Sequence, residues 1–237
     1  MSQQEGRASA VTWDFGQTLA EMDTEMLARR LGERGIAADA ARLEAAVPAA
    51  WEAYNGAVHQ GLGGHPWKIL MTRLLTVAGI EAEPAREAVD WLWTEQPRKN
   101  LWRRPIGGMI ELVRELGQAG VPLAVLSNSE GKLAELAGEL GWRELFVAIA
   151  DSGKLGFEKP GREIFAWTAE QLGVRLDQVV HIGDSLAADV EGALAAGMRA
   201  IWFRGDRARA AALGERAAVA HDAAEVRAAL ARFGIAV

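Results

Sequence analysis

The order of hydrophobic patterns along the chain constrains its fold more than any other feature. A short apolar run of strand type, residues 10–15, comes first, and residues 22–99 then show only helical spacing. After Pro105, strand and helix patterns alternate. Apolar strands that alternate with helices indicate a parallel sheet covered on both faces. The sequence therefore predicts an α/β fold, with a doubly wound core into which an all-helical block is inserted.

The expected elements can be placed from apolar spacing and from the glycines and prolines between the patterns. The strands expected after Pro105 are 121–126, 145–150, 179–182 and 200–203. The helices expected between them are 110–116, 133–140, 164–172 and 186–196. The alanine- and arginine-rich tail predicts a short helix, a weak strand over 217–220 and a final helix over 223–233.

Composition argues against several classes of function. The chain has 237 residues, half of them apolar, with a net charge of −6 and an isoelectric point near 5.4, which argues against nucleic acid as a partner. Cysteine is absent, so no thiol nucleophile, disulfide or zinc thiolate is available. The first six residues lack the features of a signal peptide, and no apolar stretch reaches the ~20 residues of a membrane span. We expect a cytoplasmic protein; its oligomeric state is open.

Polar residues follow four of the expected strands. In an open α/β sheet, the ligand site lies beyond the carboxyl ends of the strands. The residues found there are Asp14, Gly16 and Thr18, then Ser127 and Asn128, then Lys159, and finally Asp184 and Asp189. Asp14 and Asp184 could share a divalent cation such as Mg²⁺, which prefers oxygen ligands. Ser127 and the amides after it could hold phosphate oxygens, and Lys159 could neutralise that anion.

Four segments in this order resemble the motifs of the haloacid dehalogenase (HAD) superfamily. Residues 14–19, Asp-Phe-Gly-Gln-Thr-Leu, resemble its first motif, Asp-x-Asp-Gly-Thr-Leu. Residues 126–128 resemble the second motif, and Lys159-Pro160 with the helix that follows resembles the third. Residues 181–185, together with Asp189, resemble the fourth. The helical block is similar to the cap of many members. The resemblance implies a hydrolase core (1–19 and 105–237) and a helical cap domain (20–104).

The resemblance also implies a role for each polar residue. Asp14 would attack a phosphoryl group and form an aspartyl phosphate, which water then hydrolyses, while Lys159 would screen both charges. The phosphoryl oxygens would contact Thr18, Ser127 and the Asn128 amide. Mg²⁺ would be held by Asp14, the Gly16 carbonyl, Asp184 and, directly or through another group, Asp189. Together these roles imply a magnesium-dependent phosphatase for a small phosphorylated substrate.

Gly16 departs from the family pattern, since most phosphatases of the family have there an Asp that protonates the leaving oxygen. Such help is typically worth ~10²–10⁴ in rate. Three interpretations remain open: substrates with good leaving groups, a proton donor from the cap such as His59 or His65, or a weakly active or non-catalytic phosphate-ligand-binding protein. The 2-haloacid dehalogenases of the family also lack this Asp. They work without metal, however, and Asp184 in its Gly-Asp-Ser context favours the phosphohydrolase.

Two further sets of residues receive structural interpretations. His181 lies within an expected strand beside the site, and we interpret it as a packed, hydrogen-bonded histidine. The tryptophans of the helical block fall at helical spacing, which favours packing between helices. They are Trp51, Trp67, Trp91 and Trp93.

Overall fold

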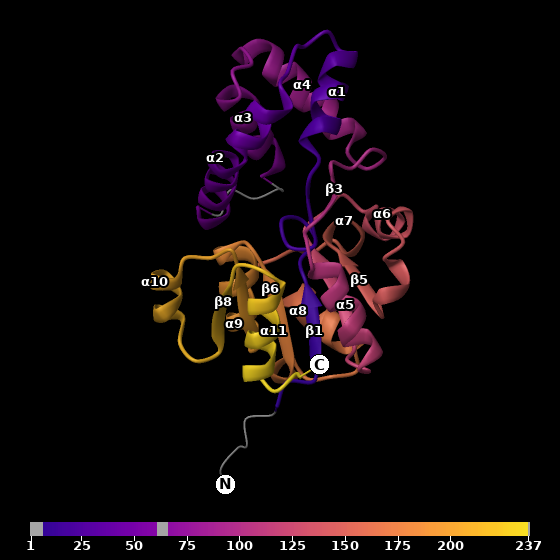
Figure 1. Cartoon of the computed structure of the whole chain (residues 1–237), viewed down its shortest axis with the longest axis vertical. Coiled ribbons are helices and arrows are strands. Elements are labelled where there is room, and N and C mark those ends of the chain that lie inside the picture. The colour runs from indigo at the N-terminus through magenta and orange to yellow at the C-terminus, as the bar shows by residue number, and fades with distance from the viewer. Residues whose placement is uncertain (1–6, 61–65, 237) are drawn as a thin grey trace. The chain divides into compact units, whose positions relative to one another are not determined.

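A computed structural model describes residues 7–60 and 66–236, except for the side chain of His59. The chain divides into two compact units, Met1–Glu21 with Pro105–Val237, and Met22–Arg104 (Figure 1). Among the described residues, every helix is too short or too polar to serve as a membrane span.

The first unit is built on a six-stranded parallel sheet with the order β5-β4-β1-β6-β7-β8 (Figure 1). Its strands are β1 (Ala10–Trp13), β4 (Leu123–Ser127), β5 (Ala148–Asp151), β6 (Val179–Gly183), β7 (Arg199–Phe203) and β8 (Ala217–Ala220). All four residues of β1 are buried, as is usual for a strand covered on both faces. Since β1 lies between β4 and β6, the chain winds outward from the centre in both directions. The ligand site of such a sheet lies at this point, beyond the carboxyl ends of the strands.

Helices cover both faces of this sheet, as the alternating pattern predicts (Figure 1). Helix α5 contacts α11 on one face, and α8 contacts α9 on the other. The helices are α5 (Met109–Gln118), α6 (Leu133–Glu139), α7 (Ser152–Leu155), α8 (Arg162–Gln171), α9 (Gly192–Ala196), α10 (Arg207–Ala210) and α11 (Ala223–Arg232). The α/β doubly wound fold is thereby confirmed.

The second unit is helical. It contains α1 (Thr24–Glu33), α2 (Ala40–His59), α3 (Trp67–Val77) and α4 (Ala82–Glu95). The first two helices begin at aspartates whose side chains accept a backbone N–H of the first turn: Asp23 from Met26 and Asp39 from Arg42. Buried leucines form its interior, and the Trp67 and Trp93 rings pack 5.3 Å apart between α3 and α4. These contacts agree with the packing role expected of the tryptophans.

The structure differs from the expected elements in several places, among them the additional short helix α7. Two short strands, β2 (Ala20–Met22) and β3 (Trp102–Pro105), form a separate two-stranded sheet and are too short and polar to show a pattern. Residues 143–145 form a 3₁₀ turn before β5, so that strand begins later than expected. The helix expected over 186–196 is a π-helical turn, Leu186–Glu191, followed by α9. Such turns recur at functional sites.

Candidate active site

Asp14 follows β1 directly, and two side chains from other segments hold its carboxylate. Its Oδ1 accepts hydrogen bonds from Lys159 Nζ at 2.6 Å and from Ser127 Oγ at 2.9 Å. Its backbone N–H donates to the carbonyl of Ile182 on β6, which extends the β1–β6 pairing by one residue. The Asp14 residue is only 7% exposed. The carboxylate is therefore held in one position at the carboxyl edge of the sheet.

Lys159 is the buried cation of this site. Its Nζ donates to Asp14 Oδ1, to Asp189 Oδ1 at 2.6 Å and to the Leu126 carbonyl at 3.0 Å, which uses all three ammonium protons. Its backbone is held as well, because the Asn128 side chain accepts the Lys159 N–H at 2.9 Å and donates to its carbonyl at 3.0 Å. The Asn128 side chain therefore holds the segment that carries the lysine.

Three carboxylates gather beside Lys159. Asp14, Asp184 and Asp189 each offer an oxygen, and these oxygens lie within 4.8 Å of one another. Asp189 projects from the π-helical turn, and its Oδ2 accepts the backbone N–H of Ser185 at 2.9 Å. The Asp184 backbone is held by its carbonyl, which accepts the indole N–H of Trp202 at 2.8 Å. Oxygen donors at this spacing suit a hard divalent cation.

The electrostatics of the cluster show a shortage of positive charge. Burial raises the pKa of Asp184 well above its ordinary value, and the nearby Asp189 and Asp14 carboxylates raise it further. Burial also raises the pKa of Asp14, against the attraction of Lys159. For Asp189, burial opposes ionisation, but Lys159 and His181 outweigh it and lower its pKa. Burial likewise opposes the charge of Lys159, but the two carboxylates outweigh it and raise its pKa. Three acids thus face one lysine, and a further cation would stabilise their charged forms.

The turn after β1 holds the remaining predicted residues. Thr18 is fully buried, and its hydroxyl has no hydrogen-bond partner in the part of the chain that the structure describes. Gly16 forms an isolated β-bridge with Ala20. Gln17 adopts a positive φ of 57°, a conformation that suits glycine better, and the motif that this segment resembles has Gly at this position. His59 and His65 are the two histidines that the sequence suggests as proton donors for the leaving oxygen. His65 lies outside the described residues, and so does the side chain of His59.

Sequence reasoning assigned no role to three residues that support this site. Thr12 bonds to His181 inside the sheet, Asp151 organises the loop after Ser127, and Trp202 holds the Asp184 carbonyl. A threonine in an otherwise apolar central strand was the one available signal for Thr12. His181 is fully buried and hydrogen-bonded, as expected.

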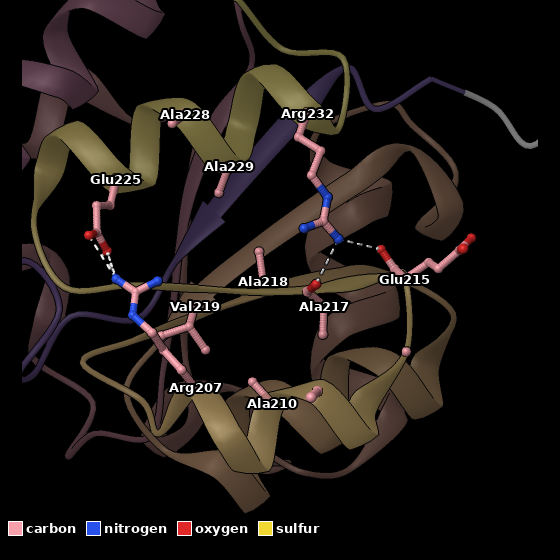
Figure 2. Close-up of a pocket in the computed structure, with 12 residues that line it drawn as sticks. Arg207, Ala210, Glu215, Ala217, Ala218, Val219, Glu225, Ala228, Ala229 and Arg232 are labelled. Atoms are coloured by element: carbon pink, nitrogen blue, oxygen red, sulfur yellow. Dashed lines mark hydrogen bonds and ion pairs between the residues drawn. The ribbon is translucent and has the colours of Figure 1, made fainter.

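A groove lies elsewhere on the same unit. A groove of about 740 Å³ runs along the edge strand β8 between α10 and α11 (Figure 2). Half of its lining residues are alanines. Arg207 pairs with Glu225 at one end, and Arg232 donates to the carbonyls of Glu215 and Ala217 at the other. None of the residues predicted for the site lines this groove. Since its arginines are engaged, we assign the chemistry to the carboxylate cluster.

One family model and several known proteins match this chain. A family model described as haloacid dehalogenase-like hydrolase matches residues 8–197. Haloacid dehalogenase-like hydrolase domain-containing protein 3 of Mus musculus is 26% identical over 205 residues, which cover 82% of this chain and 81% of that protein. Glyceraldehyde 3-phosphate phosphatase of Methanopyrus kandleri is 32% identical over 132 residues, which cover 55% of this chain and 56% of that one.

A solved structure has a similar fold over nearly the whole length of this chain. It is that of a HAD family hydrolase from Deinococcus radiodurans with bound phosphate and sodium. The two chains are 25% identical, with a TM-score of 0.66 and a coverage of 98% of each.

Proposed function

Because this chain belongs to the haloacid dehalogenase-like hydrolases, we propose that it is a magnesium-dependent phosphohydrolase that acts on a small phosphorylated metabolite through an aspartyl phosphate on Asp14. The observation that carries the proposal is the buried Asp14 carboxylate, held by Lys159 and Ser127 beside two further acids. The relative named as a glyceraldehyde 3-phosphate phosphatase supports a phosphorylated substrate, and the phosphate in the Deinococcus structure supports a phosphate site.

The residues present fit a magnesium ion. Asp14 and Asp184 supply oxygen atoms at suitable spacing, and three acids against one lysine leave charge for a divalent cation to balance. The Gly16 carbonyl would complete the protein ligands. Asp189 would act on the metal directly or by holding its neighbours, since its Oδ1 already accepts from Lys159 and His181. When bound, the ion would draw negative charge from the phosphoryl oxygens and bring Asp14 and the phosphate together.

The phosphate would lie among donors that the protein already holds in place. The Thr18 hydroxyl is buried without a partner among the described residues, as expected of a donor that a ligand engages. Ser127 ends β4, and the Asn128 backbone amide follows it at the same edge of the sheet. Lys159 would neutralise the phosphoryl group as it neutralises Asp14.

The reaction follows from these positions in two steps. An Asp14 oxygen attacks phosphorus, the bond from phosphorus to the leaving oxygen breaks, and the leaving group departs with the electron pair. Water then attacks the phosphorus of the aspartyl phosphate, and inorganic phosphate leaves with Asp14 regenerated. Gly16 offers no proton to the leaving oxygen in the first step. We therefore propose that acyl and aryl phosphates, whose leaving groups need little protonation, are the better substrates.

Phosphate release from acyl and aryl phosphates, with and without Mg²⁺, tests the proposal. Wild type is expected to turn over only with Mg²⁺, and Asp14→Asn, which keeps the shape but loses the nucleophile, is expected to be inactive. Asp177→Asn changes a partly exposed acid of the same unit, outside the carboxylate cluster, and should behave as wild type. Equal release by wild type and Asp14→Asn, or release indifferent to metal, would contradict the proposal.

Gly16 also favours a second candidate, a protein that binds phosphorylated ligands with little or no turnover. This candidate predicts that a phosphate ligand raises the melting temperature in the absence of product formation. The first candidate predicts product in the same samples.

A further inference from the structure

A continuous chain of hydrogen bonds runs from the interior of the sheet to the candidate nucleophile. Thr12 Oγ1 lies 2.9 Å from His181 Nδ1, and His181 Nε2 lies 3.1 Å from Asp189 Oδ1. Asp189 Oδ1 accepts from Lys159 Nζ at 2.6 Å, and Lys159 donates to Asp14 at 2.6 Å. We propose that Thr12 and His181 are positioning residues, which act through Asp189 and Lys159 to hold Asp14 in its reactive place.

The two inner members of the chain lie deep in an apolar environment. Thr12 and His181 are direct partners in the register of β1 and β6, and both are fully buried. The ring of Phe165 packs against the imidazole edge-on, with ring centroids 5.6 Å apart. A buried polar group is costly unless its partners are in place. Two central strands would pack well with apolar residues here, so the pair suits a positioning role better than a packing role.

The direction of each hydrogen bond follows from the chemistry of the partners. An ionised Asp189 carboxylate only accepts, so the Nε2 of His181 that faces it carries the proton. In the neutral imidazole, Nδ1 then accepts, and the Thr12 hydroxyl donates to it. Thr12 thus selects the tautomer of His181 that can donate to Asp189. This assignment follows from the network as a whole.

Asp189 has little freedom to take another position. Its Oδ1 is shared by His181 and Lys159, and its Oδ2 accepts the Ser185 N–H. A β-carbon on Gly183 would lie 2.2 Å from the Asp189 carboxyl carbon, so the strand end leaves room for this side chain only because residue 183 is glycine. Without the His181 donor, the Lys159 ammonium would be the only side-chain donor to Asp189 among the described residues, and the position of Lys159 relative to Asp14 would loosen.

Four variants test this inference, which rests on the proposed phosphohydrolase function. Thr12→Val removes the hydroxyl at nearly constant shape, Thr12→Ser retains it, and His181→Phe removes the donor to Asp189. Thr168→Val is the matched control, because it deletes another fully buried threonine hydroxyl, which donates to the Ile164 carbonyl in α8 and lies outside the chain. The melting temperature, kcat and KM are measured for each variant. The same quantities are measured for the double variant that combines Thr12→Val with His181→Phe.

A positioning role predicts an effect on kcat rather than on KM. Thr12→Val should lower kcat about five- to tenfold, the equivalent of one lost hydrogen bond, while Thr12→Ser and Thr168→Val stay near wild type. Thr12→Val should have no further effect once His181 is Phe, because the chain is already broken. Wild-type kcat in Thr12→Val, an equal loss in Thr168→Val, or independent effects of the two substitutions would overturn the inference.

A measurement that needs no turnover separates this inference from the proposed function. Long-range ¹⁵N–¹H NMR of His181 should show a proton on Nε2 and none on Nδ1 in wild type, and an altered pattern in Thr12→Val. A protonated Nδ1 in wild type would overturn the inference. Absence of any wild-type phosphatase activity with the expected NMR pattern would contradict the proposed function and leave the hydrogen-bond chain established.

Discussion

At the scale of single residues, Gly16 is the position that decides how fast the proposed enzyme works. The Asp14 carboxylate accepts hydrogen bonds from Lys159 and from the Ser127 hydroxyl, which is the arrangement that the proposed aspartyl phosphate requires. What Gly16 cannot supply is the proton for the leaving oxygen and the base for the second step. The site therefore holds the proposed nucleophile and its partners, but position 16 carries no proton donor.

Gly16→Asp should restore that missing group. We expect kcat for an alkyl phosphate, whose leaving group needs a proton, to rise about 10-fold or more. For an aryl phosphate the gain should be smaller, because its leaving group is already stable. Parallel steady-state kinetics on both substrates measure this, and an equal or absent gain on the two would contradict it. Gly16→Asn, which adds a similar side chain without an acid, is the matched control.

Glu130 is expected to make the stability of the protein depend on pH. Burial, and secondarily the charge of Asp151, raises the pKa of Glu130 to about 7 in the folded protein. A raised carboxyl pKa means that the folded state holds the proton more tightly than the unfolded state. The stability that protonated Glu130 contributes is fully present below about pH 4.5 and is lost as the pH rises to about 7. The unfolding free energy changes by at most about 3 kcal/mol over this range.

Glu130→Gln should remove this dependence. The difference in unfolding free energy between Glu130→Gln and wild type is expected to grow in favour of the variant from pH 4.5 to 7 and then level off. Urea unfolding at several pH values measures the difference. A constant difference over this range would show that the Glu130 carboxyl is not strained by burial.

At the scale of elements, Asp151 connects the end of β5 to the loop that follows Ser127. Its Oδ1 accepts from Ser129 Oγ, Gly131 N and Gly153 N, and its Oδ2 accepts from Leu133 N at the start of α6. Ser127 and Asp151 are also register partners on β4 and β5. One buried carboxylate thus shapes the loop that carries the predicted phosphate contacts.

Asp151→Asn should damage both stability and activity. An amide cannot accept on its nitrogen, so at least one buried N–H or O–H loses its partner, at a cost of about 1–3 kcal/mol in unfolding free energy. The activity should fall as well, because the loop after Ser127 loosens. Asp206→Asn, at the exposed start of α10, is the control, and its cost should be under about 1 kcal/mol with activity unchanged. Equal effects of the two substitutions would contradict this role of Asp151.

The same elements show what sequence could and could not predict. The apolar runs of β1, β4, β6 and β7 and the helical spacing of apolar residues between them can be recognised in the sequence. The doubly wound core and the collection of polar residues at one edge of the sheet could therefore be predicted. Strands β2 and β3 are too short and polar to be recognised. The Thr12–His181 pair depends on the register of two strands 169 residues apart in the chain, which no local pattern specifies. The π-helical turn around Asp189 likewise depends on tertiary contacts.

At the scale of the whole molecule, metal binding should couple to folding of the α/β unit. Three acids facing one lysine make that unit less stable than it would be with a bound cation. A ligand that binds only the folded state stabilises it by about 2.7 kcal/mol at 100 times its dissociation constant. We expect saturating Mg²⁺ to raise the melting temperature by several degrees. Asp184→Asn should abolish the rise, Asp177→Asn should keep it, and an equal rise in both would place the ion elsewhere.

Phosphorylation of Asp14 during turnover is tested most directly by rapid-quench mass spectrometry. Wild type mixed with an acyl phosphate and Mg²⁺, then quenched in acid, should carry one phosphoryl group on the peptide that contains Asp14, and Asp14→Asn should carry none. The adduct should form no more slowly than phosphate is released. Phosphate release at full rate with an unmodified Asp14 peptide would contradict the account.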